Sequence, residues 1–495
     1  MNPPRRVPLE VLSAPASARE AKEKCGVIGV WGRPDGVELT YTALFAQQHR
    51  GQESAGIAVS DGVELHGHVG MGLVAEVFDA RTLERLRRWA TADDRALGVI
   101  GHNRYSTFGG SQVCNAQPLV ERYLGGQVGV AHNGNLVNAE ALRTVFAEEG
   151  RIFHSTSDTE VMIHLLASPE QREASDPLAA TLRRLQGAFS VVFLFPDRIE
   201  AARDPWGWRP LVLGELDDGR PMVASETVAL EVVGARFVRE VEAGEIVTLS
   251  ERGVESRRFA EAAKRPAMCV FEHVYFANPS SVVFGQNVLA ARESMGAALA
   301  REAAVDADYV MPMPDSGRSA ANGYATASGI PYREGIVPNR YVGRTFIKPT
   351  QDERRTAVRL KLNVVSEIVK GKRLIVVDDS IVRGTTTREK MKQIREAGAE
   401  EIHLRISCPP IRHPCFFGVD FATREQLIAH GREVDQIRDY LGVDSLHFLS
   451  LEGLLGVMKH PAAAYCTACY SGDYRIDVEH PRTDQVLMKD QMGMF

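Results

Sequence analysis

One string in the C-terminal half of the chain joins a strand, a loop and the start of a helix: Val376-Val377-Asp378-Asp379-Ser380-Ile381-Val382-Arg383-Gly384-Thr385-Thr386. The apolar run 374–377 predicts a buried strand that ends in two acidic residues. Gly384 permits a tight loop, and the threonines begin a helix. Backbone N–H groups and a helix N-terminus therefore point at one spot, which suits a phosphate group. The adjacent carboxylates suit ribose hydroxyls, a divalent metal ion, or both.

The alternative for this string is a strand end whose Asp and Thr residues only cap the next helix. Two adjacent acids and a run of threonines exceed what a helix cap requires, so we favour a ligand site. The spacing Gly-x4-Gly-Lys-Ser/Thr is absent, which excludes a Walker A loop. In open α/β sheets, ligands bind beyond the carboxyl ends of the strands, and this string lies at such a place.

The elements around the string predict an α/β fold for the C-terminal half. Helix-length segments at 290–304 and 387–397 separate short apolar strands at 309–311, 374–377 and 402–406. Short, fully apolar strands that alternate with helices are typical of a parallel sheet covered on both faces.

The N-terminal half has a different pattern. Short apolar runs such as 26–30, 129–131 and 190–195 alternate with turn residues, and a helical pattern covers 158–166. Many strands with grouped helices predict a layered α+β domain. The charged stretch 251–265 is interpreted as the crossing between the domains. We expect a leader at 1–24, a first domain at 25–260, a second at 261–470 and a polar tail at 471–495.

Composition excludes several classes of protein. The 495 residues are 44% hydrophobic and 25% charged, with a net charge of −6. A slightly acidic chain lacks the basic face that nucleic acid requires, and no apolar run is long enough to span a membrane. The first 24 residues have no apolar core, so they are not a secretory signal. We therefore expect a cytoplasmic protein whose seven cysteines stay reduced.

Cys25 is the candidate nucleophile. It stands directly before the strand pattern 26–30 and behind a segment that has no evident packing role. A cysteine in this position is most often a small buried residue, and on its own it would be interpreted so. The rest of the domain changes that interpretation.

Three further segments carry residues suited to an amino acid substrate. Arg104 supplies the bidentate guanidinium that an α-carboxylate needs. Asn133 and Gly134 can form an oxyanion hole from a side-chain amide and a backbone N–H, although a hairpin turn is the alternative. Asp158 can bind an α-ammonium group, although a helix N-cap is its alternative and both roles can coexist.

In this order, these residues resemble the motifs of the class II (N-terminal nucleophile) glutamine amidotransferases. Two further segments match: Gln48-His49-Arg50-Gly51-Gln52-Glu53-Ser54-Ala55-Gly56 and Arg203-Asp204-Pro205-Trp206-Gly207-Trp208-Arg209-Pro210-Leu211. The resemblance covers about 25–250 and implies the four-layer fold of that class. It also implies that the leader is removed, so that the α-amine of Cys25 becomes the catalytic base.

The string at 376–386 resembles the signature of the type I phosphoribosyltransferases, which bind phosphoribosyl pyrophosphate (PRPP). That resemblance assigns Asp378 and Asp379 to the ribose and its Mg²⁺, and 380–386 to the 5′-phosphate. Ser316, in the segment 312–317, is a further metal or pyrophosphate contact on this view; an ordinary turn is the alternative. The polar segment 339–349 and the basic run 354–361 are interpreted as a lid over pyrophosphate.

A glutaminase half followed by a PRPP half resembles the amidophosphoribosyltransferase family, over nearly all of 25–470. The family implies that ammonia passes internally from Cys25 to C1 of PRPP, giving 5-phosphoribosylamine at the first step of purine synthesis. It also implies one Mg²⁺ per subunit, inhibition by purine nucleotides and a homotetramer. Glucosamine-6-phosphate synthase would lack the string 376–386. A PRPP-sensing regulator would have no reason to keep the glutaminase residues.

Four of the remaining cysteines are candidate metal ligands. Cys466 and Cys469 form a Cys-x2-Cys pair, with Cys269 and Cys415 upstream. Four soft thiolates suit an iron–sulfur cluster or zinc, and plain buried thiols are the third alternative. Some members of the family carry a 4Fe–4S cluster on four matching cysteines, so the resemblance favours one cluster per subunit. Cys114 and Cys408 are expected to be inert core residues.

Overall fold

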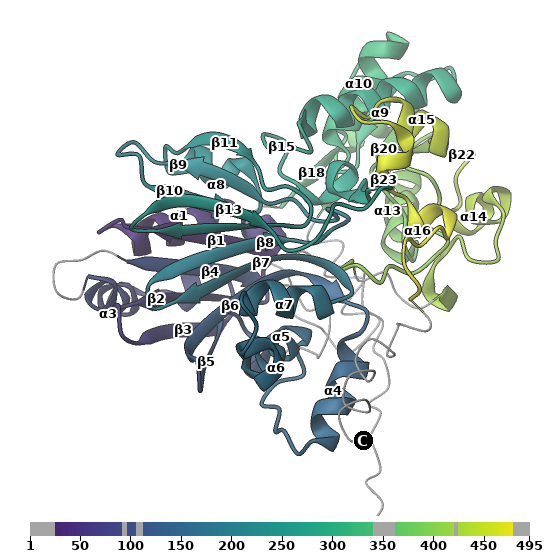
Figure 1. Ribbon diagram of the computed structural model, residues 1–495. Coiled ribbons are helices and arrows are strands. Elements are labelled where there is room, and N and C mark those ends of the chain that lie inside the picture. The colour runs from purple at the N-terminus through teal and green to yellow at the C-terminus, as the bar shows by residue number, and fades with distance from the viewer. Residues whose placement is uncertain (1–24, 92–96, 105–111, 340–361, 420–423, 479–495) are drawn as a thin grey trace, which may run out of the picture.

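The computed structural model describes residues 25–91, 97–104, 112–339, 362–419 and 424–478. Two units follow each other along the chain: the first holds two antiparallel sheets, and the second is built on a parallel sheet (Figure 1). None of the helices in these ranges is long and apolar enough to cross a bilayer.

The first sheet of the N-terminal unit has seven strands in the order β11-β9-β10-β1-β4-β2-β3, and each neighbouring pair is antiparallel. Its strands are β1 (Gly26–Trp31), β2 (Ser54–Ser60), β3 (Leu65–Met71), β4 (Gly98–Arg104), β9 (Val212–Glu215), β10 (Pro221–Ala224) and β11 (Arg236–Glu240). Strand β1 is buried along its whole length, since both of its faces are covered.

The second sheet has six strands in the order β13-β12-β8-β7-β6-β5, again antiparallel. They are β5 (Leu119–Tyr123), β6 (Gly126–Leu136), β7 (Gly187–Phe195), β8 (Arg198–Arg203), β12 (Glu245–Ser250) and β13 (Gly253–Arg258). Strand β13 corrects the expected crossing at 251–265. Its residues pair with β12 as an edge strand, so the chain leaves this unit only after Arg258.

The two sheets pack face to face through apolar side chains, among them Val27 and Ile100 from the first and Val192 and Leu194 from the second. Outside the first sheet lie α1 (Gly36–Ala46), α2 (Val74–Val77), α3 (Ala80–Ala90) and α8 (Thr227–Val232). Outside the second lie α4 (Ala139–Glu148), α5 (Asp158–Ala167), α6 (Pro169–Arg172) and α7 (Pro177–Arg184). This arrangement confirms the predicted four-layer α+β fold.

The C-terminal unit has a parallel sheet in the order β17-β20-β21-β22, which confirms the predicted α/β fold. Its strands are β17 (Tyr309–Pro312), β20 (Arg373–Asp378), β21 (Glu401–Ile406) and β22 (Ser445–Phe448). The larger helices are α9 (Val288–Glu302), α10 (Arg318–Ser328), α13 (Thr385–Glu396) and α14 (Val434–Leu441). Short helices are α12 (Ser366–Val369), α15 (Leu451–Gly456) and α16 (Ala468–Ser471).

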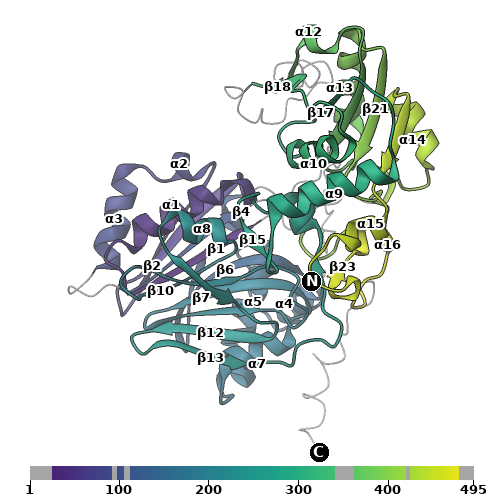
Figure 2. The ribbon, with the colours of Figure 1, turned by 90° about the horizontal axis from the view of Figure 1, so that it is seen from above.

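Short strands complete this unit: β14 (Met268–Cys269), β15 (Val282–Val283), β16 (Gln286–Asn287), β18 (Ile336–Pro338), β19 (Leu362–Val364) and β23 (Tyr465–Cys466). A π-helical turn, Glu272–Phe276, follows β14. Seen from above, α9 runs along the side of the C-terminal unit that faces the N-terminal unit (Figure 2). The units share a small apolar core, in which the rings of Trp208 and Phe417 stack at 4.4 Å.

Candidate active sites

Cys25 directly precedes β1, at the end of the sheet where the antiparallel neighbour β4 finishes. Gly26 pairs with Asn103, so Cys25 and Arg104 are the next residues at that same edge. Both side chains are buried. The carbonyl oxygen of Cys25 accepts a hydrogen bond from Nε of Arg50 at 3.0 Å. The sheet thus places the predicted nucleophile and the predicted carboxylate-binding arginine at one edge.

A glycine allows this edge to form. A β-carbon at Gly51 would lie 2.6 Å from the backbone carbonyl carbon of Asn103, closer than any side chain permits. The loop before β2 therefore lies directly against the end of β4. From that loop Glu53 accepts a hydrogen bond from Nη1 of Arg104 at 3.3 Å. The matched segment 48–56 thus serves to position Arg104.

Asn133 and Gly134 are in the middle of β6, where they pair with Ser190 and Phe189 of β7. The hairpin-turn alternative is therefore wrong. Asn133 is buried, and its Nδ2 has no hydrogen-bond partner among the residues that the structure describes. Gly134 has φ +154°, and a β-carbon there would lie 2.0 Å from the carbonyl oxygen of Ala188. A free amide donor beside an obligatory glycine suits an oxyanion hole.

Asp158 is the first residue of α5, and it does not cap the helix. Ser157 is the N-cap, because its side chain accepts from the N–H of Thr159. Asp158 instead accepts the N–H of Leu136 at 2.9 Å. The capping alternative is thus wrong, because that role belongs to the preceding residue.

The charge of Asp158 suits a cationic partner. Although burial raises its pKa, the imidazole of His132, the Leu136 N–H and the charge of Arg104 together hold that pKa below its usual range. The carboxylate therefore stays ionised at neutral pH. Arg104, at the end of β4, and Asp158, at the start of α5, present one cation and one anion, as the two charged ends of an amino acid require.

The second predicted site lies at the carboxyl end of β20. The N–H of Asp379 donates to Oδ1 of Asp378 at 2.9 Å, and the Ser380 hydroxyl donates to Oδ2 of Asp379 at 2.7 Å. Gly384 is the N-cap of α13, with φ +74° and no side-chain cap, so the acids do not cap that helix. Burial and the neighbouring Asp379 raise the pKa of Asp378 well above its usual range.

The loop that follows is open at one end and anchored at the other. Ile381 is buried, and the Val382 carbonyl accepts the N–H of Ile428 at 2.8 Å. Arg383 donates to Gln426 at 2.6 Å. Thr385 and Thr386 are exposed in the first turn of α13. The helix N-terminus therefore faces solvent, where an anion can reach it.

The segment 312–317 lies directly behind the acidic pair. The N–H of Met313 donates to the Val377 carbonyl at 2.8 Å, and a β-carbon at Gly317 would lie 3.2 Å from Cα of Asp378. Ser316 precedes this glycine, and its role as a metal or pyrophosphate ligand stays a prediction. Of the predicted lid, only Asn339 belongs to the described residues; 340–349 and the basic run 354–361 lie outside them.

The four candidate ligand cysteines come together at the boundary of the two units. Cys269 and Cys466 stand opposite each other in the parallel β14–β23 pair. The N–H groups of Arg412 and His413 donate to the carbonyl of Cys469 at 3.0 Å, which brings the 412–417 loop alongside. In that loop the N–H of Phe417 donates to Sγ of Cys415 at 3.4 Å.

Burial raises the pKa of the Cys269 thiol to about 12 and that of Cys466 to about 11. Burial and the neighbouring thiols of Cys415, Cys466 and Cys269 raise the pKa of Cys469 as well. Across the described ranges, no group of three or more His, Cys, Asp or Glu side chains stands at metal-binding geometry. The four thiols thus lie near one another, but they do not have the geometry of a metal site.

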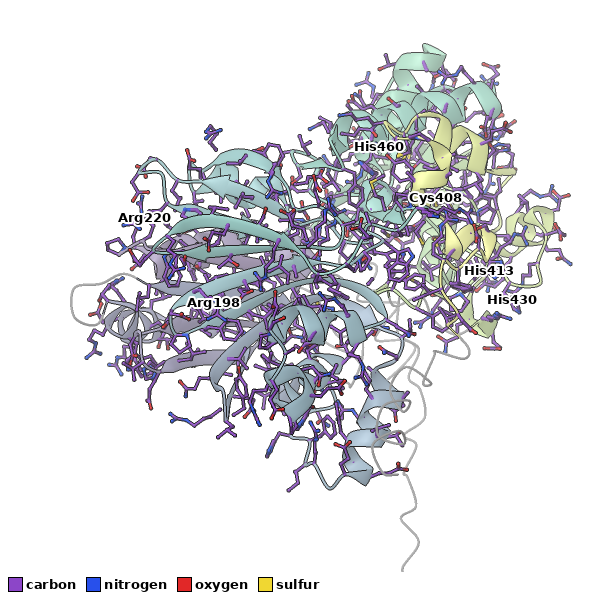
Figure 3. All side chains as sticks on the ribbon, viewed as in Figure 1. Arg198, Arg220, Cys408, His413, His430 and His460 are labelled. Carbon is purple, nitrogen blue, oxygen red and sulfur yellow. The ribbon has the colours of Figure 1, made fainter. Side chains whose placement is uncertain are left out.

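The two remaining cysteines differ. Cys408, labelled in Figure 3, is fully buried beyond the end of β21, as expected for a core residue. Cys114 is exposed on a short 3-10 helix, so its predicted core position is wrong. No sequence pattern around Cys114 distinguishes these two positions.

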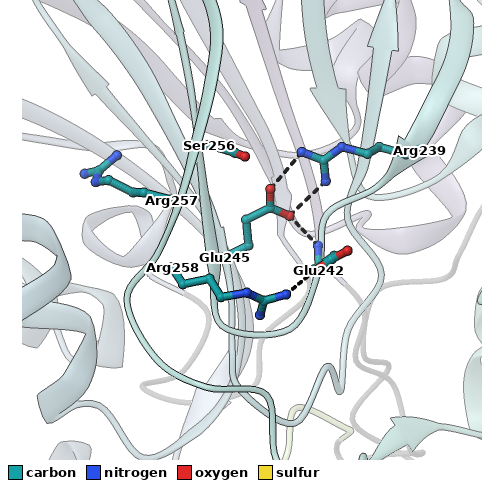
Figure 4. Close-up of a pocket in the computed structure, with 6 residues that line it drawn as sticks. All are labelled: Arg239, Glu242, Glu245, Ser256, Arg257 and Arg258. Carbon is teal, nitrogen blue, oxygen red and sulfur yellow. Dashed lines mark hydrogen bonds and ion pairs between the residues drawn. The ribbon is translucent and has the colours of Figure 1, made fainter.

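A polar cavity of about 500 Å³ lies between β11 and the β12–β13 edge of the second sheet, and it contains none of the predicted site residues (Figure 4). Its lining arginines already have acidic partners: Arg239 binds Glu245, Arg258 binds Glu242, and Arg257 binds Asp176 and Glu200. Its charges thus neutralise one another, and we assign it no chemistry.

Sequence reasoning missed a buried set of charged residues behind Cys25. Arg50 and Arg209 are part of quoted segments but were given no role, and Glu272 was not singled out at all. Arg50 and Arg209 both donate to the carboxylate of Glu272. Only the place of Arg50 and Arg209 in matched segments could have indicated a role, because the contacts with Glu272 join residues 63 to 222 positions apart.

The two units and their sites define a class of protein: a glutamine amidotransferase domain joined to a phosphoribosyltransferase-like domain with a parallel sheet. A family model described as a glutamine amidotransferase domain matches residues 102–232. The chain belongs to the amidophosphoribosyltransferase family. It is an enzyme of the pentosyltransferase class that acts at the first step of purine biosynthesis.

Two relatives illustrate the match. The amidophosphoribosyltransferase of Bacillus subtilis (strain 168) is 45% identical over 468 residues, which cover 94% of this chain and 96% of the relative. That of Methanothermobacter thermautotrophicus is 47% identical over 462 residues, covering 92% and 95%.

Two solved structures match over most of the chain. The PRPP amidotransferase of B. subtilis, solved with ADP and GMP, has a TM-score of 0.83 at 44% identity and covers 92% of this chain and 98% of its own. A structure described as the allosteric regulatory enzyme of purine biosynthesis has a TM-score of 0.84 at 45% identity, covering 92% and 97%.

Proposed function

We propose that the chain hydrolyses glutamine at Cys25 and passes the ammonia to C1 of PRPP, giving 5-phosphoribosylamine, glutamate and pyrophosphate. The observation that carries this proposal concerns buried Asn133, beside Gly134 in the sheet that faces Cys25 and Arg104: within the described ranges its Nδ2 has no hydrogen-bond partner. An unused donor in a dry site is costly unless a ligand uses it.

In the glutaminase reaction, Arg104 binds the α-carboxylate of glutamine and Asp158 binds its α-ammonium group. The thiol of Cys25 attacks the side-chain amide carbon, and its proton passes to the leaving nitrogen. Nδ2 of Asn133 and the N–H of Gly134 donate to the oxyanion. The C–N bond then breaks, ammonia leaves, and water hydrolyses the thioester to glutamate and free thiol.

Removal of residues 1–24 supplies the base for this reaction. A new α-amine at Cys25 has a pKa near 8 and lies on the same residue as the thiol, so it can take the thiol proton directly or through water. By family resemblance, the Cys25 thiol cleaves the preceding peptide bond itself. The intact mass of active enzyme tests this: a chain that begins at Cys25 supports it, and full glutaminase activity with the leader attached contradicts it.

In the second reaction, the 5′-phosphate is held by the loop and first helical turn after β20, which consist of Ser380, Ile381, Val382, Arg383, Gly384, Thr385 and Thr386. Asp378 and Asp379 bind the ribose hydroxyls. Ammonia attacks C1, the bond from C1 to the pyrophosphate oxygen breaks, and the extra proton goes to solvent. The ammonia passage between the sites, like the lid at 339–349, rests on family resemblance.

The acidic pair fits Mg²⁺. Burial and the adjacent carboxylate of Asp379 raise the pKa of Asp378, and a bound cation would relieve the repulsion between the two acids. Asp378, Asp379 and Ser316 are the oxygen ligands we assign to one Mg²⁺ per subunit. When bound, the ion neutralises charge on the pyrophosphate leaving group. The chain's own contribution is to hold the ribose and phosphate in register at the end of β20.

The four cysteines, three of them buried and Cys415 partly exposed, fit one 4Fe–4S cluster per subunit by their ligand type. Cys269, Cys415, Cys466 and Cys469 are soft ligands gathered from distant parts of the chain, and metal binding would favour their thiolate forms. Cys269 on β14, Cys466 on β23, Cys415 in the 412–417 loop and Cys469 would hold the cluster, whose role would be structural. Zinc remains the alternative, and the iron content of the purified protein distinguishes the two metals.

The remaining assignments rest on the family. We propose domains at 25–260 and 261–470, cytoplasmic location, a homotetramer, and inhibition by purine nucleotides; the similar B. subtilis structure was solved with ADP and GMP. The experiment that tests the function is pyrophosphate release from PRPP by the purified chain, with glutamine or ammonium as nitrogen donor. Release with both donors supports the proposal, and release with neither contradicts it.

A further inference from the structure

A buried carboxylate from the C-terminal unit lies at the centre of a charged network behind the glutaminase site. Glu272 is fully buried in the π-helical turn that follows β14. Its two oxygens accept hydrogen bonds from Nη2 of Arg50 at 2.8 and 2.9 Å, and Oε1 also accepts from Nη1 of Arg209 at 3.0 Å. One acid of the second unit therefore binds two arginines of the first.

Arg50 connects this acid to Cys25. The same guanidinium that binds Glu272 donates through Nε to the Cys25 carbonyl, and through Nη1 to Glu226. Its side chain is 1% exposed, so each of its donors is committed inside the protein. The planar, rigid fork of an arginine fixes all three partners relative to one another.

The π-helical turn is also held by the C-terminal unit. Arg292 of α9 donates to the carbonyls of His273 and Ala277, at 2.7 and 2.9 Å, and so holds both ends of the π-helical turn. Arg209, which binds Glu272, also donates from Nε and Nη2 to the Phe417 carbonyl in the 412–417 loop. The position of Glu272 is thus set by elements of the second unit.

We infer that Glu272 is a positioning residue for the glutaminase reaction: through Arg50 it fixes Cys25, so the C-terminal unit completes the active site of the N-terminal unit. This inference rests on the proposed function, in which Cys25 becomes the first residue of the mature chain. A first residue has one covalent tether, its own carbonyl, and Arg50 holds that carbonyl. Without this hold the thiol and α-amine rotate together, away from the oxyanion hole.

Stability alone does not account for this network. Replacing a buried ion pair by apolar residues is often neutral or stabilising, because removing charges from water is costly. Arg50 binds both Glu226 and Glu272, Arg209 binds Glu272, and His49 also contacts Glu226. What the network supplies is a fixed geometry, and displacement of a reacting group by about 1 Å can slow a reaction about a hundredfold.

The test compares the processed parent enzyme, whose chain begins at Cys25, with equally processed Glu272→Gln and Arg50→Lys, and with Arg257→Lys as a matched control. Arg257 also binds two carboxylates, Asp176 and Glu200, but its contacts lie on the second sheet, away from Cys25. Three quantities are measured: the rate at which a diazoketone analogue of glutamine alkylates Cys25, kcat and KM for glutamine, and pyrophosphate release with ammonium.

We expect alkylation and glutamine-dependent kcat to fall about tenfold or more in both variants, while KM for glutamine and the ammonium-dependent rate stay within about twofold of the parent. Arg257→Lys should match the parent. Variants that alkylate at the parental rate overturn the inference, and so does an Arg50→Lys chain whose ammonium-dependent rate falls equally, since that marks a general stability role. A parent that is not alkylated at Cys25 contradicts the proposed function itself.

Discussion

Gly134 lies so close to Ala188 that a β-carbon on the glycine would stand 2.0 Å from the alanine's carbonyl oxygen. No other residue can therefore occupy this place in β6. The close approach fixes the backbone at Gly134, and with it the direction of the neighbouring Asn133 amide. The predicted oxyanion hole is thus a rigid part of the sheet.

Asn133→Ala should lower glutamine-dependent turnover about a hundred- to a thousandfold, because it removes one oxyanion donor. The ammonium-dependent rate should not change, since that reaction takes place in the other unit. Gln127→Ala is the matched control: it removes an amide from the same strand, where Gln127 accepts the Leu65 N–H. Steady-state rates with both nitrogen donors give the answer. Equal turnover in the parent and Asn133→Ala would remove Asn133 from the mechanism.

Replacing either acid at the end of β20 should stop PRPP use. In Asp378→Asn or Asp379→Asn the ribose site loses a negative charge, so pyrophosphate release should fall with either nitrogen donor, while Cys25 alkylation continues. Asp444→Asn is a control in the same unit, where Asp444 accepts the Ile402 N–H far from the loop. Parental PRPP affinity and turnover in both variants would show that the acids have no role in the site.

Glu160 should make stability depend on pH. Its carboxylate accepts the N–H groups of His154 and Ser155 and the Ser155 hydroxyl, which hold the loop before Asp158. Although burial raises its pKa, the His164 side chain and these donors lower it from 4.5 to about 2. A depressed folded-state pKa gives stability that is present above the unfolded value and is lost as the pH falls toward 2.

Between about pH 5 and pH 2, the parent should therefore lose up to about 3 kcal/mol more unfolding free energy than Glu160→Gln does. Denaturant unfolding at several pH values measures this difference. Glu140→Gln, which removes an exposed charge from α4, should follow the parent. A Glu160→Gln curve parallel to the parent's would mean that these hydrogen bonds do not depend on charge.

Local patterns predicted the two fold classes, and family resemblance supplied the four-layer arrangement and the site residues. The alternation of apolar strands with helices predicted the parallel sheet, and the order of Cys25, Arg104, Asn133 and Asp158 predicted one composite site. What failed was local detail. Asp158 was a candidate N-cap, but α5 begins at Asp158 itself, so the preceding residue, Ser157, is the N-cap. Cys114 lies on an exposed 3-10 helix that no periodicity indicated.

The network around Glu272 could not be predicted for a different reason. Glu272 and Arg50 are 222 residues apart, and neither stands in a pattern that requires a partner. Burial of a charged residue depends on the whole tertiary fold, because only a partner from another element makes it tolerable. The same holds for the meeting of Cys269 with Cys466, which spacing alone left open.

Anaerobically purified protein should be brown and contain about four irons and four sulfides per chain. Serine in place of any one of Cys269, Cys415, Cys466 or Cys469 should lower both iron content and yield, because each ligand comes from a different part of the site. Cys114→Ser is the control and should keep full iron content. Metal and sulfide analysis decides this point, and active, colourless protein with stoichiometric zinc would exclude the iron–sulfur cluster.

The central claim is that one chain holds two separate active sites, and that ammonia released at the first is used at the second. Cys25→Ala tests this claim most directly. Pyrophosphate release from PRPP is measured for the parent and the variant, first with glutamine and then with ammonium. We predict that the variant loses glutamine-dependent release and keeps ammonium-dependent release near the parental rate, because Asp378, Asp379 and the phosphate loop are unchanged. A folded variant that binds PRPP but has lost both activities, or one that still uses glutamine, would contradict the account.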